Sequence, residues 1–422
     1  MVYLITFVFM LCIGVPIAFV IGITPFIKML YSGGIPSMVF PQRMFYGATN
    51  YMLVAIPFFI LAGNLMNSSG LTKRIIRFAQ IFVGRISGGL GMVTVIASMF
   101  FGGITGSANA ECAAIGSIMI PSMKKEGYDL DFSAALVVTA STMGPIIPPS
   151  ISFVLYGVIA GESIGKLFLA GAIPGVMIGL SLLVITYIIS KKRNYPRMPG
   201  VQFKEAIVVI KDGILALIMP LIILGGIFSG IFTPTESGVI ASIYALIIGF
   251  FVYKELTLKA LFDAVFEAAK LSAMLLLIVS MSSVFSWALA AEQIPTKVAE
   301  SILILSNNKY LVLLMLNIVM LIMGCILEPT SNLIILTPIF LAIVKLLGID
   351  TLHFGVIMVL NLTIGLITPP VGMCLFTACG IAKISLERIL KPLVPLLAVV
   401  IGVLFLVTYI PWFSLYLVNF MK

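Results

Sequence analysis

Two short stretches, GPIIPPS (Gly144–Ser150) and GLITPPV (Gly365–Val371), share Gly, Ile and a Pro-Pro pair at four of their first six positions. Each lies inside an apolar run long enough to cross a membrane. Proline has no N–H and cannot bond the carbonyl four residues earlier, so a Pro-Pro pair interrupts a helix. The pattern predicts two transmembrane helices that are broken in the same way.

The composition around these stretches is that of a membrane protein. The chain has 422 residues, of which 61% are hydrophobic and only 10% are charged, and its mean hydropathy is +1.21. A water-soluble protein cannot hide that much apolar surface, so we expect an all-α polytopic membrane protein whose solvent is the lipid bilayer. The net charge of +9 is spread over short loops between apolar runs, which excludes nucleic acid as a partner. The apolar N-terminus lacks a basic n-region and predicts a retained helix, not a signal peptide.

Two apolar runs are long enough to enter the membrane and return, at about 88–123 and about 310–347. Each has small or polar residues at its middle, GGITGSANAE in the first and EPTSN in the second. We predict two re-entrant helical hairpins, whose tips must be buried in protein. The broken helices follow them at about 130–160 and about 352–380.

The distribution of basic residues predicts the orientation. The polar segment KKRNYPRMPG (Lys191–Gly200) carries Lys191, Lys192, Arg193 and Arg197, which places it in the cytoplasm. Counting spans from there, the first hairpin opens inward, the second opens outward, and the C-terminus is periplasmic. We therefore expect an inverted-topology repeat, with residues 1–190 as the first unit, 191–212 as a cytoplasmic linker and 213–422 as the second unit. The run 1–31 is either one span or two short ones.

The breaks and the tips offer oxygen atoms. Pro148 and Pro149 release the carbonyls of Gly144 and Pro145, and the second pair releases those of Gly365 and Leu366. A freed carbonyl in hydrocarbon costs several kcal/mol unless it is satisfied, and a hard cation can satisfy it.

The tips lie at nearly the same sequence distance before the two breaks and add further oxygens. They supply Ser107 and Asn109 in the first half, and Thr330, Ser331 and Asn332 in the second. The spacing predicts two cation sites that face each other near the midplane, where half-helix N-termini favour an anionic substrate. The alternative is that the prolines are plain kinks.

Three carboxylates lie deep in apolar sequence. Glu111 and Glu328 flank the tips, where they could tune the sites or take part in proton coupling. Glu236, in FTPTESG, is more simply explained as the cap of a helix that starts after Thr235.

Parts of the sequence also fit two other functions. GESIG (Gly161–Gly165) fits the GxSxG hydrolase pattern, but it lies in a short loop between spans, and the only histidine is His353, so we expect no enzyme. An ion channel is the more serious alternative, although hairpins that open to opposite sides suit alternating access better.

Several long motifs resemble the large membrane subunit of tripartite ATP-independent periplasmic (TRAP) transporters. They are AIPFFILAGNLM (55–66), ASMFFGGITGSANAECAAIG (97–116), GPIIPPSI (144–151), GIFTPTESG (230–238) and EPTSNLIILTPI (328–339). The resemblance covers nearly the whole chain. It implies a fold similar to that of divalent anion–sodium symporters, with a scaffold and a mobile transport domain that moves like an elevator. It also implies sodium-driven uptake of an organic acid, such as sialic acid or a C4-dicarboxylate, across the bacterial inner membrane.

The same resemblance implies partners and site residues. The partners are a small four-helix membrane subunit and a periplasmic substrate-binding protein. We expect no fused small subunit, because the chain starts directly with the large-subunit pattern. The implied ligands of at least two sodium ions are Ser107, Asn109, Gly144, Ile147, Pro149, Thr330, Asn332, Gly365, Thr368 and Val371. A stand-alone divalent anion–sodium symporter is the alternative.

Overall fold

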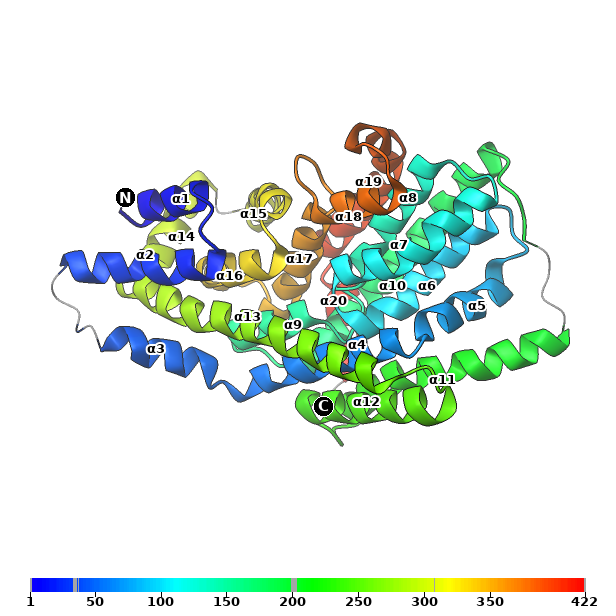
Figure 1. The fold of residues 1–422 in the computed structure, drawn as a ribbon. Helices are drawn as coiled ribbons and strands as arrows, with labels where there is room; N and C mark the ends of the chain where they lie inside the picture. Colours follow the sequence, from blue (N-terminus) through cyan, green and yellow to red (C-terminus); the bar gives the residue numbers. More distant parts are fainter. Residues whose placement is uncertain (1, 33–35, 37, 199–202, 307, 421–422) are drawn as a thin grey trace.

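The computed structural model describes residues 2–32, 36, 38–198, 203–306 and 308–420, and these residues form helices and loops without a strand (Figure 1). The first half contains α1 (Val2–Cys12), α2 (Ile17–Ser32), α3 (Val39–Ala48), α4 (Ala55–Ser68), α5 (Leu71–Val83), α6 (Gly89–Thr105), α7 (Ala108–Lys125), α8 (Leu130–Ala140), α9 (Ile151–Ala160) and α10 (Ile164–Lys192). The second half contains α11 (Phe203–Phe228), α12 (Pro234–Ile247), α13 (Leu258–Ala291), α14 (Ile294–Leu305), α15 (Lys309–Ile326), α16 (Pro329–Leu346), α17 (Thr351–Gly365), α18 (Met373–Ala382), α19 (Leu386–Tyr409) and α20 (Trp412–Leu415).

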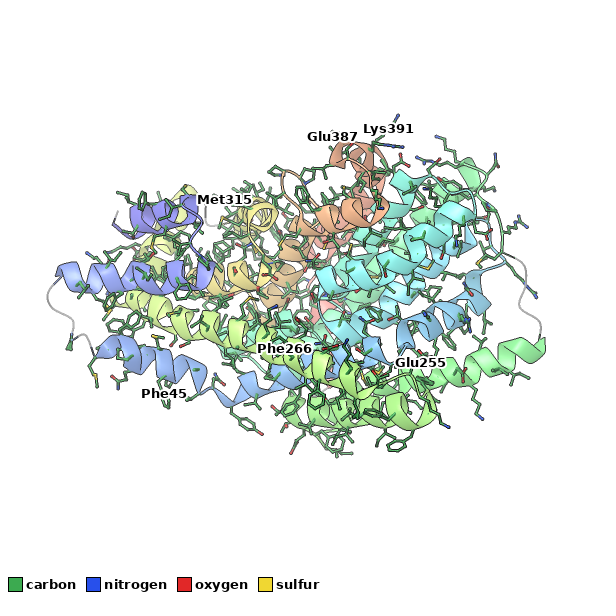
Figure 2. The ribbon with its side chains drawn as sticks, viewed as in Figure 1. Phe45, Glu255, Phe266, Met315, Glu387 and Lys391 are labelled. Atoms are coloured by element: carbon green, nitrogen blue, oxygen red, sulfur yellow. The ribbon has the colours of Figure 1, made fainter. Side chains whose placement is uncertain are left out.

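The surface of this helical assembly is that of a protein in lipid. Eight helical segments among the described residues are long and apolar enough to cross a membrane. Large apolar side chains lie on the outside, including Phe45 of α3 and Phe266 of α13, which are 71% and 68% exposed (Figure 2). Exposed apolar surface on this scale requires lipid or protein around it, so the prediction of an all-α polytopic membrane protein is confirmed.

The two halves place their helices in the same order. A helix pair (α6 with α7, α15 with α16) is followed by a helix broken in two (α8 with α9, α17 with α18) and then by a long helix (α10, α19). The bounds agree closely with the expected hairpins and broken helices. In both breaks the peptide bond between the two prolines is cis. That each pair begins and ends on one side of the membrane, and that the halves are inverted, stay predictions.

The halves interlock instead of lying side by side. Helix α7 packs against α18 of the other half, and α16 packs against α9. Helices α8 and α10 both pack against α19 (Figure 1). Each hairpin therefore contacts the broken helix of the opposite half as well as its own.

The N-terminal part differs from the simplest expectation. The run 1–31 contains two helices, α1 and α2, and that these are two short spans stays a prediction. After α2, the helices α3 and α4 are separated by a 3₁₀ turn, Tyr51–Val54.

Two further helices lie where no span was expected. Helix α5 is amphipathic, with buried Leu71 and Ile75 on one face and Arg77 on the other. The segment between α13 and α15 contains α14. Helix α5 packs against α6, and α14 packs against α16, so one short helix supports each hairpin.

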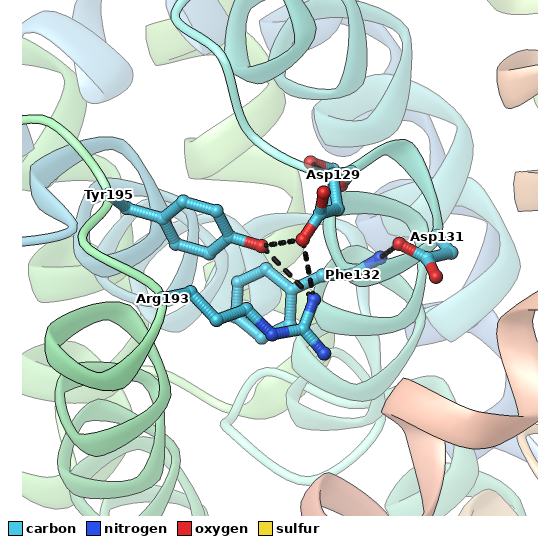
Figure 3. A network of polar contacts seen from close by, with 6 residues as sticks. Asp129, Asp131, Phe132, Arg193 and Tyr195 are labelled. Atoms are coloured by element: carbon cyan, nitrogen blue, oxygen red, sulfur yellow. Dashed lines mark hydrogen bonds and ion pairs between the residues drawn. The ribbon is translucent and has the colours of Figure 1, made fainter.

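The start of the linker is fixed to the first half (Figure 3). Asp129 Oδ2 accepts from Arg193 Nη1 at 2.7 Å and from the Tyr195 hydroxyl at 2.6 Å. The arginine also lies over the ring of Phe132, with 5.5 Å to the ring centroid. The hydrogen bonds from Tyr195 and Arg193 lower the pKa of Asp129, and partial burial and the bond to Asp129 raise the pKa of Tyr195 to about 12. Residues 199–202 of the linker and Lys422 lie outside the described residues, and the predicted periplasmic C-terminus stays a prediction.

Candidate functional site

The first hairpin tip is a two-residue joint that lies against the first break. Gly106 has φ +60°, a conformation that favours glycine, and Ser107 begins α7 by accepting from the N–H of Ala110 at 3.5 Å. A Cβ built on Gly144 would lie 3.2 Å from the Ser107 carbonyl oxygen, and one built on Gly106 would lie 3.1 Å from the Pro149 carbonyl oxygen. The predicted pairing of this tip with this break is therefore observed.

One of the carbonyls released in the first break has a partner within the chain. Ser150, directly after the prolines, donates its hydroxyl to the Pro145 carbonyl, and its oxygen accepts from Phe153 N–H at 3.3 Å. The same side chain caps α9 and satisfies the carbonyl. A carbonyl has two lone pairs, so this bond leaves room for a second contact. The sequence reasoning did not identify Ser150, although its place after the Pro-Pro pair was a usable signal.

Asn109 is connected to the opposite half. Its Oδ1 accepts from the Thr377 hydroxyl of α18 at 2.7 Å. The Cys112 thiol, one turn further along α7, donates to the Cys374 carbonyl at 3.5 Å. The expected partner of Asn109 was the first break, and the structure shows that its amide oxygen is held by the helix after the second break.

The second tip packs against the second break through two glycines. A Cβ built on Gly365 would lie 2.4 to 2.7 Å from backbone atoms of Gly324 in α15. Near the joint, Asn332 donates to the carbonyls of Met323 and Leu327, both at 3.0 Å, and so links α16 to the end of α15. Asn332 Oδ1 and Thr330 Oγ1 are buried without a hydrogen-bond partner. Two unpartnered oxygens at one tip suit a cation, because each would otherwise be left desolvated.

The carbonyls released in the second break are both engaged. Gly365 accepts from Thr368 N–H at 3.1 Å, and Leu366 accepts from Cys374 N–H at 3.2 Å. The Thr368 hydroxyl donates a hydrogen bond to the Ile364 carbonyl oxygen at 2.7 Å. Val371 is 37% exposed. The chain folds back on itself within the break, so each released carbonyl has one N–H partner, and its second lone pair stays available for the predicted cation.

A cavity of ≈ 70 Å³ lies between the two tips. Its walls include Ser107, Asn109 and Pro145 from the first half, Glu328, Thr330 and Leu366 from the second, and Leu271 and Leu275 from α13. This volume is enough for a few waters or ions, but small-molecule sites usually measure about 300–1,000 Å³. The two tips thus meet at one space whose largely apolar wall carries a few polar side chains. The sequence could not assign α13 to it.

Of the three carboxylates, Glu111 and Glu328 lie near the tips, whereas Glu236 caps a helix. Glu111 is fully buried, neither of its oxygens has a partner, and a Cβ built on Gly144 would lie 2.6 Å from its Oε2. Glu328 begins α16 and lines the cavity. Glu236 accepts from the backbone N–H of Thr233 at 2.7 Å in a capping box, so its capping role is confirmed. The helix starts after Thr233, two residues before the expected Thr235.

The GESIG stretch is a turn between α9 and α10. Gly161 ends α9 with φ +73°, and Ser163 caps α10 by accepting from Lys166 N–H at 3.4 Å. His353 is buried, and its ring nitrogens lie 3.0 Å from the Ser414 hydroxyl and 3.3 Å from the Thr408 carbonyl oxygen. Ser163 therefore serves as a helix cap, and the histidine packs elsewhere.

Comparison with known proteins gives a consistent result. Residues 4–413 match the family model described as "Tripartite ATP-independent periplasmic transporter, DctM component". The sialic acid TRAP transporter large permease protein SiaM of Vibrio cholerae is 42% identical over 89% of this chain and 88% of its own length. The C4-dicarboxylate TRAP transporter large permease protein DctM of Pseudomonas aeruginosa is 41% identical over 90% of this chain and 89% of its own length.

A longer relative and one solved structure complete the comparison. The isethionate TRAP transporter permease protein DctMQ of Oleidesulfovibrio alaskensis is 42% identical over 96% of this chain, which spans 64% of that relative's length. The crystal structure of the Alcanivorax borkumensis YdaH transporter superposes with a TM-score of 0.64 over 88% of this chain and 86% of that one. At 14% identity this last likeness concerns the fold alone.

Proposed function

The chain belongs to the DctM component family of the tripartite ATP-independent periplasmic transporters, and on that premise we propose that it imports an organic acid across the bacterial inner membrane, driven by sodium. Its relatives are named as permeases, which are transport proteins and not enzymes. The substrate is a small carboxylate such as sialic acid or a C4-dicarboxylate, or a sulfonate of the isethionate kind. A periplasmic binding protein delivers it, and a small four-helix membrane subunit completes the complex.

The meeting of both hairpin tips and both broken helices at one small cavity, with polar side chains from each half, carries this proposal. One structural half supplies Ser107 and Asn109, and the other supplies Thr330 and Leu366. Secondary transporters bind substrate and ions at such a repeat interface and move one unit past the other. The packing of α5 on α6 and of α14 on α16 gives each hairpin one short helix through which a scaffold could hold it during an elevator movement.

Sodium is proposed at the two tips. The first site uses Ser107, Asn109, Gly144, Ile147 and Pro149, and the second uses Thr330, Asn332, Gly365, Thr368 and Val371. Support is strongest for Asn332 and Thr330, whose buried oxygens lack a partner. In the first site the close approach of Ser107 to Gly144 brings the Ser107 carbonyl oxygen to the break. Oxygen-only ligands of this kind suit a hard cation.

At ≈ 70 Å³ the cavity between the tips is smaller than the usual small-molecule site, so we expect the tips or α13 to move when an organic acid binds. This requirement fits alternating access, in which the site is closed in one state and open in another. An ion channel needs no such closure, because conduction depends on a continuous path.

Reconstitution tests the proposal. The chain, its small membrane subunit and the binding protein in proteoliposomes should accumulate radiolabelled substrate only under an inward sodium gradient. Full uptake driven by a proton gradient in sodium-free buffer would contradict sodium coupling. Robust uptake by the chain alone would favour the stand-alone symporter.

A further inference from the structure

A second polar cavity lies away from the tips, between α3, α13 and α9. It measures ≈ 340 Å³, and its polar lining includes Arg43, Asn50, Ser282, Ser283 and Ser286, with Trp287 beside them. This volume falls within the range of small-molecule sites. No carboxylate lines it.

Arg43 is the charged group of this cavity and is held in a fixed place. Helix α3 packs tightly on α13, because a Cβ built on Gly47 would lie 2.6 Å from Cβ of Ser283, and Ser280 donates to the Met44 carbonyl at 2.7 Å. The Arg43 guanidinium lies over the Trp287 ring, with 5.6 Å to the ring centroid. A cation–π contact of this kind uses no N–H group of the arginine, so these donors stay available to a planar anion.

Within the described part of the chain, Arg43 forms no ion pair with a carboxylate. Arg74, near the other end of α4, contrasts with it, because Glu255 neutralises that arginine at 2.7 Å. The hydroxyls of Ser282, Ser283 and Ser286 also form no hydrogen bond to described residues. A half-buried arginine beside open hydroxyls and without a counter-charge is a site suited to an anion.

The same two helices connect this cavity to the tips. On α13, Leu271 and Leu275 line the cavity between the tips, and Val279, Ser282 and Ser286 continue the same face into the Arg43 cavity. On α9, Ile151 and Ser152 line the first cavity, and Val158 and Ile159 line the second. At 1.5 Å per residue the two cavities are about 10–15 Å apart along each helix.

The position along α10 shows which side this cavity faces. Val158 and Ile159 lie just before the start of α10, which is 29 residues long and ends at Lys192 in the basic linker. The two ends are about 40 Å apart, which exceeds the thickness of the hydrocarbon core. The basic residues of the linker predict that it is cytoplasmic, and on that prediction the Arg43 cavity lies toward the periplasm.

We propose that the Arg43 cavity is a periplasmic waiting site that binds the carboxylate of the organic acid before it reaches the tips. Arg43 pairs with the carboxylate, the α13 serines bind its remaining oxygens, and the shared faces of α9 and α13 lead it inward. The inference rests on the proposed function for its ligand class, but the binding step itself needs no tip residue and no sodium.

Trp287 provides a direct reporter, because the chain has two tryptophans. A Trp412→Phe variant in phosphatidylcholine nanodiscs, in choline chloride without sodium, is titrated with succinate and with N-acetylneuraminate. We expect a saturable change in Trp287 fluorescence with at least one carboxylate and none with neutral succinamide. Arg43→Gln should weaken binding roughly 10-fold or more, and Arg43→Lys should weaken it less, since lysine keeps the charge but loses the two-pronged contact. Lys309→Gln, which removes a cation outside the cavity, should titrate like the parent.

Three results would overturn the proposal. The first is that Arg43→Gln and its parent give the same fluorescence titration, and the second is that neither carboxylate changes the fluorescence. The third is a fluorescence change only when phosphatidylglycerol replaces phosphatidylcholine, which would assign the cavity to lipid. In the reconstituted complex, Arg43→Gln should raise the half-saturating substrate concentration and leave the maximal rate nearly unchanged. Failure of sodium to drive uptake would refute the proposed coupling while leaving the sodium-free binding result intact, so the two failures are distinguishable.

Discussion

The two tips carry similar residue types, but the hydrogen-bond partners of these residues differ. At the first tip, Asn109 Oδ1 is hydrogen-bonded to Thr377, and Ser150 satisfies the Pro145 carbonyl. At the second, Asn332 Oδ1 and Thr330 Oγ1 are buried without partners, while backbone N–H groups satisfy the released carbonyls. Two similar motifs therefore give one tip whose asparagine oxygen is committed to the protein and one whose oxygens are left for a ligand.

The largest expected difference concerns the glycines where each hairpin meets its break. Gly365→Ala places a Cβ 2.4 to 2.7 Å from backbone atoms of Gly324, which cannot move aside easily. In Gly144→Ala the nearest atom is Oε2 of Glu111, the end of a flexible side chain. We expect Gly365→Ala to lower the free energy of unfolding by about 3 kcal/mol and Gly144→Ala by about half as much.

Thermal unfolding of the purified variants measures this difference, and size-exclusion chromatography gives the fraction of protein that is still folded at each temperature. Gly380→Ala is the control, because a Cβ there meets nothing within 4 Å and alanine favours the helix. Equal melting temperatures for the Gly365 and Gly144 variants would show that the two hairpin–break contacts accommodate an added Cβ equally well.

Sodium dependence should separate the two asparagines. Asn332→Ala removes an unpartnered oxygen and two donated bonds at the tip, and we expect apparent sodium affinity to fall about 5- to 150-fold. Asn109→Ala should shift it less, because the Asn109 oxygen is shared with Thr377. Initial uptake rates against sodium concentration measure both shifts. Curves that overlay the parent for both variants would leave the prolines as plain kinks.

Thr377→Val tests the link between the first tip and α18. If Asn109 acts through its bond with Thr377, the single variants should have similar effects, and the double variant should be no worse than either. The sodium dependence of uptake by the two single variants and the double variant gives the coupling energy between Asn109 and Thr377. Additive effects would mean that the two side chains act separately.

A smaller effect is expected where the two breaks end. Ser150→Ala removes the cap of α9 and leaves the Pro145 carbonyl with one partner fewer, at a cost of about 1–2 kcal/mol in unfolding free energy. Val371→Ser adds a hydroxyl at the matching, partly exposed position and should change little. Thermal unfolding compares the two. An equally large loss for Val371→Ser would show that the second break is as tightly packed as the first.

The smallest effect concerns the residues that precede the two broken helices. Asp129 begins α8 and pairs with Tyr195 and Arg193, whereas Asp350 begins α17 and accepts from His353 N–H at 2.9 Å. The pKa of Asp129 is lowered in the folded protein, so its contribution is present above its unfolded pKa of about 3.9 and is lost as pH falls through the folded value. Asp129 is 56% exposed, so we expect no more than about 0.5 kcal/mol.

The ratio of folded to unfolded protein, measured in urea between about pH 6 and pH 3, tests this contribution. Asp129→Asn should be slightly less stable than the parent near pH 6 and should equal it at the acid end. A difference that grows as pH falls would contradict the assigned sign.

Much of the fold followed from local sequence. The Pro-Pro pairs located both breaks, and the small or polar residues at the middle of two long apolar runs located both hairpin joints. These features depend on missing N–H groups and on backbone conformations available to few residues, so they can be read in one dimension. The same reasoning identified the capping role of Glu236, although it placed the helix start two residues late.

Tertiary structure decided where the polar groups are used. Hydropathy indicated that Ser107, Asn109, Thr330 and Asn332 lie near the breaks, but not that Asn109 binds Thr377 of the other half or that Asn332 keeps a bare oxygen. It also did not place Arg43 beside Trp287 or put one face of α13 along both cavities. A helix break depends on a residue's own backbone, whereas a hydrogen-bond partner or a cavity wall depends on which distant helices pack together, and packing is set by the complementary shapes of whole helix faces.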